Sequence, residues 1–310
     1  MRVISLLPAA TEIVAALDAL DALVGVTHEC DFPPEVRALP RVTRTAVDGS
    51  ADAAAIDAAV RQLAAGGAPL FEVLEAETTA LSPDVILTQG LCDVCAVSEV
   101  AVRALAARLT PAPRIVSLTA SSLDGVLDDV SRVGEALGLR ERGVALVAAL
   151  RQRLAAVEAR VRAGALARPR VAVIEWTDPL YAAGHLTPEL VELAGGDDVL
   201  GARGAHSRVV TLAELRSAAP DVVVISPCGF DLPRAAAEAR RLLGRADWSW
   251  VRGRPVWAVD ANALLTRPGP RLVDGVETFA GILHPDLFGA PAASYAIGIT
   301  ADLPTAGPLR

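Results

Sequence analysis

Four cysteines are the side chains of this sequence most able to do chemistry. Cys92 and Cys95 form a CxxC pair in the segment TQGLCDVCAV, whereas Cys30 and Cys228 stand alone. Together with a histidine, these thiols have the ligand types of a closed zinc site or of an iron–sulfur cluster. The presence of only one CxxC pair argues against a zinc site, because dedicated structural zinc sites usually carry two such pairs. The sequence leaves the metal hypothesis open.

The same thiols allow three other roles. A CxxC pair at the start of a helix has a lowered thiol pKa and can exchange disulfides, and the helix-compatible segment AVSEVAVRALAARL follows Cys95. His28 and Cys30 are close in sequence, so a Cys–His nucleophile with Asp31 is another hypothesis, although no oxyanion loop accompanies it. Small thiols that only pack a loop are the ordinary alternative.

Several classes of function lack the residues they need. The sequence has no GxSxG, no GxxxxGK[ST], no HExxH and no GxGxxG after a strand. Its formal net charge is -8 without a basic run, which argues against nucleic acid and anionic lipid as partners. No stretch approaches the roughly 20 apolar residues of a membrane span. We also expect no signal peptide, because Pro8 interrupts the first apolar run, and hence a cytoplasmic protein, or an extracytoplasmic one if the start is misassigned.

The elements that must position these residues follow an α/β pattern. Each of seven short β-branched runs is followed by a polar loop and then by helical spacing, which indicates parallel strands. The predicted strands are residues 2–6, 22–26, 84–88, 114–118, 170–176, 221–226 and 255–260.

Two pairs of similar segments indicate that the chain contains a duplication. ALSPDVILTQGLC and SAAPDVVVISPC each combine a helix end, a Pro-Asp turn, a buried strand and a cysteine. TEIVAALDALDALVGV and PELVELAGGDDVLG each read as a helix, a turn and a short strand. The sequence therefore predicts two similar Rossmann-like lobes with parallel sheets.

A long helix is predicted between the lobes. Residues 139–167 keep apolar side chains at helical spacing without a proline, which fits a helix of about 25 residues and nearly 40 Å. It would join lobes at 1–138 and 168–289 across a ligand cleft, with 290–310 as a loose tail. Open α/β sheets bind ligands beyond the carboxyl ends of their strands, so the loops at those ends form the candidate site.

The residues in these loops support a shared site. All four cysteines and two of the four histidines, His28 and His185, lie in loops that follow predicted strands. Aromatic residues make up only 4% of the chain, yet Trp176 and Phe230 are also in such loops. Flat apolar rings beside a cleft suit a large planar ligand, although ordinary packing explains them equally well.

These motifs together resemble a known family. LLPAATEIVAAL, THECDFP, TQGLCDVCAVS, GHLTPELVELAGG, DVVVISPCGFDL and VDANALLTRPGPRLVDG are similar to the cobalamin-binding branch of the ABC-transporter solute-binding proteins, over residues 2 to 288. The resemblance implies two Rossmann-like lobes joined by one helix, no catalysis, cobalamin or a related corrinoid as ligand, and an ABC permease as possible partner. It implies contacts from Pro8, Thr11, His28, Glu29, Cys30, Asp31, Gln89, Gly90, Cys92, Cys95, Trp176, His185, Cys228, Phe230, Asn262 and Arg267.

The resemblance also raises two questions about partner and ligand. Family members that dock a permease carry a glutamate seven residues before each Pro-Asp, whereas this chain has alanine there and Glu77 and Glu214 one residue later. The docking pair is therefore either relocated or lost. Siderophore and haem binders share the scaffold, but few arginines are available for an anionic chelate, chiefly Arg208 and Arg267.

Overall fold

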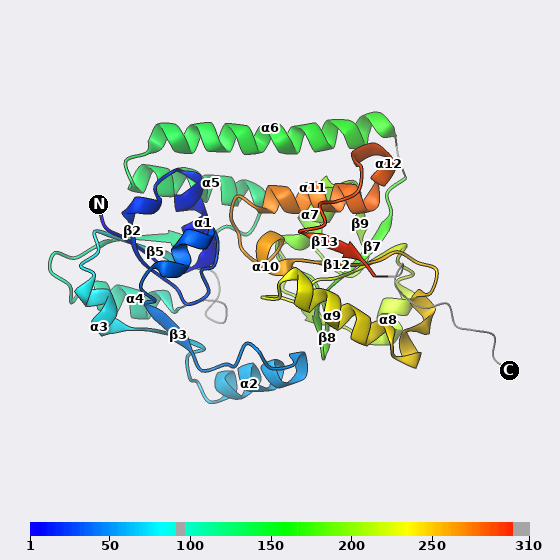
Figure 1. The fold of residues 1–310 in the computed structure, drawn as a ribbon, viewed down its shortest axis with the longest axis horizontal. Coiled ribbons are helices and arrows are strands. Elements are labelled where there is room, and N and C mark those ends of the chain that lie inside the picture. Colours follow the sequence, from blue (N-terminus) through cyan, green and yellow to red (C-terminus); the bar gives the residue numbers. More distant parts are fainter. Residues whose placement is uncertain (91–96, 166, 300–310) are drawn as a thin grey trace. The chain divides into compact units, whose positions relative to one another are not determined.

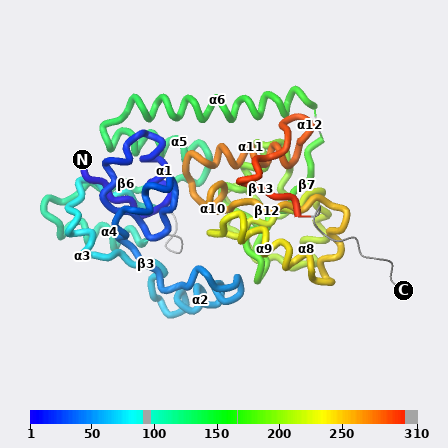
Figure 2. Tube along the Cα trace, in the orientation of Figure 1, coloured from blue at the N-terminus to red at the C-terminus, as the bar shows by residue number. Residues whose placement is uncertain are grey.

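The computed structural model describes residues 1–90, 97–165 and 167–299. The chain forms two compact units, each an α/β structure (Figures 1 and 2). The first unit comprises Met1–Gln152 with Pro268–Pro270, and the second begins at Arg153 and takes the rest of the described chain. The predicted α/β fold class is confirmed.

The first unit contains a four-stranded sheet in the order β2-β1-β5-β6, with all neighbours parallel. The four strands are β1 (Val3–Ser5), β2 (Leu23–Val26), β5 (Val85–Gln89) and β6 (Arg114–Leu118). A separate antiparallel pair consists of β3 (Thr43–Thr45) and β4 (Phe71–Val73). The helices are α1 (Pro8–Ala16), α2 (Ala53–Ala65), α3 (Glu75–Ala80), α4 (Glu99–Ala106) and α5 (Leu123–Ala136), with short 3-10 turns η1 (Leu20–Ala22) and η2 (Pro34–Ala38).

Alternating side chains build a hydrophobic layer on each face of this sheet. Val3 and Leu87 belong to a buried cluster with residues of α1 and α5, whereas their neighbours Ile4 and Ile86 belong to another with residues of α4. Successive strand residues point to opposite faces, so a strand buried on both sides needs an unbroken apolar run. An unbroken β-branched apolar run is the pattern that predicts these strands.

The second unit contains a larger, mixed sheet. The strands are β7 (Arg170–Thr177), β8 (Leu180–Ala182), β9 (Asp197–Asp198), β10 (Arg208–Val209), β11 (Val222–Ile225), β12 (Val256–Val259) and β13 (Ala296–Gly298). Strands β9, β7, β11 and β12 are parallel neighbours, and β8, β10 and β13 pair antiparallel. The helices are α7 (Thr187–Leu193), α8 (Leu212–Ser217), α9 (Leu232–Leu243), α10 (Ala261–Leu264), α11 (Leu272–Leu283) and α12 (Pro285–Phe288), with a 3-10 turn η3 (Ala246–Val251).

The predicted duplication is visible at the two Pro-Asp turns. In the first unit, the Arg2 backbone N–H donates to Asp84 Oδ2 at 2.6 Å, and Asp84 N–H donates to Arg2 O. In the second, Arg170 N–H donates to Asp221 Oδ2 at 2.8 Å, and Asp221 N–H donates to Arg170 O. Each aspartate thus ties the start of a central strand to the strand beside it. The three parallel strands β2-β1-β5 of the first unit also correspond, in this order, to the parallel strands β9-β7-β11 of the second.

The predicted long helix is α6 (Arg140–Gly164), with 25 residues. The division between the units falls inside it, after Gln152. Within the first unit, Arg142 donates to Leu17 O at 3.1 Å, and within the second, Arg153 Nε donates to Glu277 Oε1 at 2.9 Å. Each half of α6 is therefore attached to its own unit. No helix of the described residues has the length and apolarity to cross a membrane.

The prediction of a loose tail from residue 290 is wrong for residues 296–299. Strand β13 pairs antiparallel with β12, and Ile299 is fully buried in the core of the second unit. Ile299 N–H also donates to Val256 O at 2.7 Å. The Ala-, Pro- and Gly-rich composition suggested disorder, but three residues are enough to add an edge strand. Residues 300–310 lie outside the described chain.

Candidate functional site

The sequence-predicted residues of the first unit lie at the carboxyl edge of its sheet. Parallel strands end at one edge, so the loops that follow β1, β2 and β5 are brought to the same side. Pro8 is half-buried at the start of α1, which follows β1. Gln89 is the last residue of β5, and Gly90 follows it. The segment from His28 to Asp31 follows β2, with Glu29 exposed. Cys92 and Cys95 lie outside the described residues.

His28 is held by a hydroxyl pair that sequence reasoning did not identify. Its backbone N–H donates to Thr43 Oγ1 at 3.0 Å, and its Nδ1 lies 2.7 Å from the same oxygen. Thr27 Oγ1 is 2.7 Å from Thr43 Oγ1, and the imidazole packs against Phe71 with 5.6 Å between ring centres. Burial, with a smaller effect of the Arg41 guanidinium, lowers the pKa of His28. The imidazole is therefore neutral at pH 7.

Cys30 is a packed thiol. It is 1% exposed, and its Sγ lies 3.0 Å from Oγ1 of Thr11, which is fully buried on α1. Arg41 Nη1 donates to the carbonyls of Thr27 and Cys30 at 3.1 and 2.9 Å, which fixes the loop backbone around the thiol. This burial favours a packing role for Cys30 over a role as nucleophile, because a reactive thiolate needs access and an electropositive setting.

In the second unit, an aromatic and cationic stack lies at the carboxyl edge. Trp176 at the end of β7 meets Phe230 edge-on, with 5.4 Å between ring centres. The Arg234 guanidinium lies 3.6 Å from the centre of the Phe230 ring. Phe230 is 2% exposed, so it is a buried support against which Trp176 and Arg234 pack. Trp176 itself is half-buried. Cation–π contact of this kind holds a guanidinium in place.

Backbone hydrogen bonds join the neighbouring loops of this edge. Cys228 N–H donates to Glu175 O at 2.9 Å, and Asn262 N–H donates to Phe230 O at 3.2 Å. The Cys228 thiol is exposed, in contrast to that of Cys30. Arg267 is 6% exposed, so it is poorly placed to meet an anionic chelate directly. The loops after β7, β11 and β12 therefore form one connected surface.

His185 lies in the loop between β8 and α7 and is exposed. Its ring meets that of His206 edge-on at 5.1 Å between centres. Behind it, Gly184 N–H donates to Glu175 Oε2 at 3.3 Å. Burial raises the pKa of Glu175 despite the opposing effects of hydrogen bonds and of His185. Burial likewise raises the pKa of Asp198, which accepts two backbone N–H groups of the following turn.

The metal hypothesis gains no ligand cluster from the described residues. Among residues 1–90, 97–165 and 167–299, no three or more His, Cys, Asp or Glu side chains are grouped so as to hold an ion. Two of the four thiols that the hypothesis requires, Cys92 and Cys95, fall outside these ranges, whereas Cys30 is buried and Cys228 exposed.

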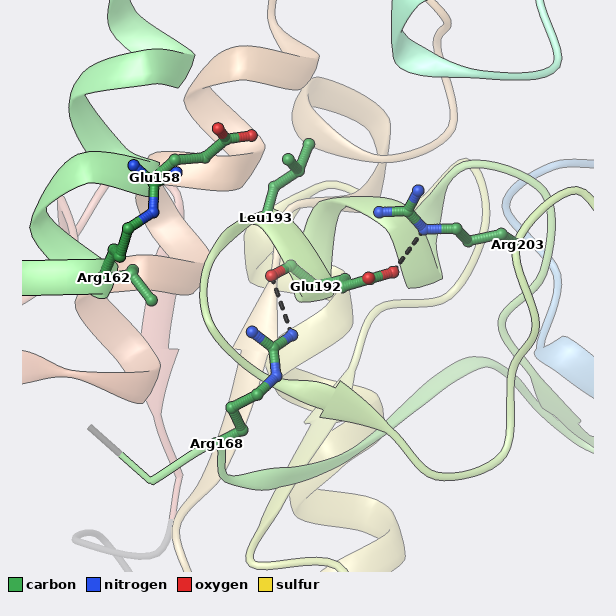
Figure 3. A pocket seen from close by; sticks show the side chains of 7 residues that line it. Glu158, Arg162, Arg168, Glu192, Leu193 and Arg203 are labelled. Atoms are coloured by element: carbon green, nitrogen blue, oxygen red, sulfur yellow. Dashed lines mark hydrogen bonds and ion pairs between the residues drawn. The ribbon is translucent and has the colours of Figure 1, made fainter. Parts of the chain in front are cut away.

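A pocket of about 430 Å³ on the second unit has a different character (Figure 3). Two of its three arginines contact Glu192. Arg203 Nε lies 2.5 Å from Glu192 Oε2, and Arg168 donates to Glu192 O at 3.0 Å. None of the sequence-predicted site residues lines it. The lining residues are Glu158, Val161, Arg162, Arg168, Glu192, Leu193 and Arg203.

The structure adds partners that the sequence did not reveal. Arg41 and Thr43 hold the loop after β2, and His206 joins His185. These three come from segments without a motif of their own. Arg234 lies in the first turn of α9, and its contact with Phe230, which precedes the helix, was likewise not predicted.

The family model described as periplasmic binding protein matches residues 3–249. Two curated relatives match most of the chain. One, from Bacillus subtilis (strain 168), is named uncharacterized ABC transporter substrate-binding lipoprotein YvrC and is 26% identical over 295 residues, covering 93% of this chain and 81% of the relative. The other, from Halobacterium salinarum, is named cobalamin-binding protein and is 27% identical over 289 residues, covering 91% of this chain and 69% of the relative.

A solved structure supports the fold. The periplasmic heme binding protein from Pseudomonas aeruginosa superposes with a TM-score of 0.69 at 21% identity, over 92% of this chain and 93% of that one. At this identity the likeness concerns the fold alone. The names of these proteins place one as a lipoprotein and one in the periplasm, so the expectation of a cytoplasmic protein finds no support among them.

Proposed function

The chain belongs to the periplasmic binding protein family, and on that premise we propose that it binds cobalamin or a related corrinoid without catalysing a reaction. The observation that carries the proposal is the 27% identity, over 289 residues, with proteins named cobalamin-binding protein. The quoted motifs resemble the same branch of the family, and of the residues in them Pro8, His28 and Cys228 follow parallel strands at the carboxyl edges of the two sheets.

The composition of these loops suits a corrinoid. The first unit offers the imidazole of His28, supported by Thr43, and the second offers the ring of Trp176 and the guanidinium of Arg234, each in contact with Phe230. A corrinoid combines a broad, largely apolar ring face with amide groups at its rim. Ligand sites of this kind pair aromatic walls with a few placed polar groups. We propose that these loops supply the contacts to the ligand.

A haem or ferric siderophore is the second candidate, because a haem-binding protein shares the fold. Anionic ligands of this class favour accessible guanidinium groups. Arg267 is buried, and the exposed Arg208 already donates through Nη1 to Glu214 Oε1 at 3.2 Å, so neither of the two arginines considered above is both accessible and unengaged by a carboxylate. The corrinoid therefore remains the better match.

Location and partner follow from the same proposal. We propose that the protein works outside the cytoplasm and delivers its ligand to an ABC permease, as the names of its relatives suggest. Glu77 and Glu214 are both exposed and both occupy the third position of a short helix before a Pro-Asp turn. Because they are equivalent in the two units, they are the candidate docking residues.

The deciding experiment is a binding titration with four ligands in parallel. Cyanocobalamin, hydroxocobalamin, haemin and a ferric hydroxamate are each titrated into the purified protein, and binding is followed by calorimetry and by the visible bands. We expect saturable binding of one corrinoid per chain and weaker or no binding of haemin and hydroxamate. Saturable binding of haemin or hydroxamate without corrinoid binding would replace the proposal by the second candidate.

A further inference from the structure

Two of the chain's four histidines form an exposed pair in the second unit. His185 follows β8, whereas His206 lies in the loop before β10, and both side chains are exposed. Their ring centres are 5.1 Å apart, with an angle of 85° between the ring planes. The contact between the two rings depends on how their two loops pack.

The two loops are locked together by their backbones. His185 N–H donates to Ala205 O at 2.6 Å, and Gly204 N–H donates to His185 O at 2.9 Å. Gly184 lies so close that an added Cβ would be 2.5 Å from both Ala205 O and Ser207 N. Only glycine allows this approach. The distance between the two imidazoles is therefore fixed by backbone contacts and does not depend on long, flexible side chains.

The backbone of His185 is held in an uncommon conformation. Its φ is 52°, in the left-handed region that costs a non-glycine residue free energy. Because the surrounding bonds impose this conformation, the exposed imidazole is directed toward His206 at a cost to stability. Backbone strain at an exposed polar side chain is typical of a site with a function.

The separation of the rings suits a shared metal ion. Imidazole nitrogen binds Zn²⁺ at about 2.0–2.1 Å, which puts a ring centre about 3 Å from the ion. Two imidazoles on one tetrahedral ion then have centres about 5 Å apart. The observed 5.1 Å meets this condition.

We propose that His185 and His206 form a two-imidazole site for a divalent transition-metal ion of borderline softness, such as Zn²⁺, Ni²⁺ or Co²⁺. Water or a donor group of a bound ligand completes the coordination shell, as in metal sites that keep open positions. Free imidazole nitrogens bind such ions without any change of fold. His185 is also among the residues that the resemblance implies for corrinoid contact, but the metal site is argued from the histidine pair alone and does not rest on the proposed corrinoid function.

The test uses Zn²⁺ as the probe and the full chain, with accessible thiols alkylated to remove competing ligands. Calorimetry measures affinity, and ¹⁵N-detected NMR of the imidazoles identifies the ligands, since the chain has only four histidines. His185→Asn suits the left-handed backbone, and His206→Gln changes an exposed side chain, so both variants should fold. Cys228→Ser is compared with them because Cys228 is the exposed thiol of the described chain.

We expect one Zn²⁺ per chain, shifts in the imidazole signals of His185 and His206 only, and at least about tenfold weaker binding in each histidine variant. Cys228→Ser should bind like the parent chain. The proposal is overturned if Zn²⁺ does not bind, if it binds equally well to both histidine variants, or if the signals of His28 or His284 shift in place of the pair. Corrinoid binding is measured separately on the same variants without alkylation, so failure of one proposal leaves the other measurable.

Discussion

Replacing Trp176 by alanine tests whether the aromatic stack of the second unit is a wall of the ligand site. Trp176 is half-buried, touches Phe230 at 5.4 Å between ring centres, and donates through Nε1 to Asp178 O at 3.1 Å. A tryptophan buries about 200 Å² when fully covered, so a ligand that covers half of it hides about 100 Å². At about 25 cal/mol per Å² the ring contributes about 2.5 kcal/mol, or about 60-fold in Kd.

The assay is calorimetric titration with cyanocobalamin, accompanied by thermal unfolding of each variant. Trp176→Ala should weaken binding about 60-fold, whereas Trp176→Phe keeps a flat ring and should lose less than about tenfold. Trp250→Phe is the matched control, because Trp250 packs against Trp248 in η3 and is not among the candidate site residues. If Trp176→Ala folds normally and binds cyanocobalamin as tightly as the parent chain, the assignment of this ring to the ligand wall is refuted.

Three further predictions concern the fold that carries the site. Ile299→Ala removes three carbons from a fully buried side chain and should lower the free energy of unfolding in urea by about 2–4 kcal/mol. The control Val209→Ala, at a half-exposed residue, should lower it by less than about 0.5 kcal/mol. Equal losses in the two variants would contradict the packing of β13. Burial raises the pKa of Glu175, so this residue contributes to stability below its ordinary pKa of 4.5, and the contribution is lost as pH rises through the pKa of the folded state. Glu175→Gln should therefore lessen the decline of the free energy of unfolding between pH 4 and 8. An unchanged pH profile in this variant would contradict the assigned role of Glu175. Cys30, buried beside Thr11, should resist alkylation in the native protein, whereas the exposed thiol of Cys228 should be modified within minutes. Peptide mass mapping measures both rates, and equally fast labelling of Cys30 would contradict its burial.

The strands of both sheets could be predicted because burial leaves a strong local pattern. Each central strand is covered on both faces, so its sequence is a continuous β-branched run, as in Val222–Ile225. Pro-Asp before β5 and β11 marked the entry to a strand, and the structure shows why, since the aspartates bond the backbones of Arg2 and Arg170. Local sequence alone contains this information.

The short antiparallel strands could not be predicted in the same way. Strand β10 has two residues, and β8 and β13 have three each, which is too few for any periodic signal. They form because an edge of an existing sheet offers unpaired N–H and C=O groups. Ile299 shows the consequence, since its burial depends on a core assembled by segments far earlier in the chain.

The candidate site was predictable as a set of loops but not as a set of contacts. The rule that ligands bind beyond the carboxyl ends of parallel strands selected the segments around His28, Trp176 and Cys228. It could not supply Thr43 or His206, whose relation to the predicted histidines arises only when loops distant in sequence pack together. Pairing of this kind depends on tertiary packing and leaves no spacing to recognise.

The two units share the turn that builds the sheet and differ in the loops that surround it. Asp84 and Asp221 make the same pair of backbone bonds, which tie the start of β5 to β1 and the start of β11 to β7. At the carboxyl edge no such constraint acts. There the first unit presents the imidazole of His28 on a threonine pair, and the second presents Trp176 with a guanidinium. The duplicated scaffold thus presents unlike side chains at the carboxyl edges of its two sheets.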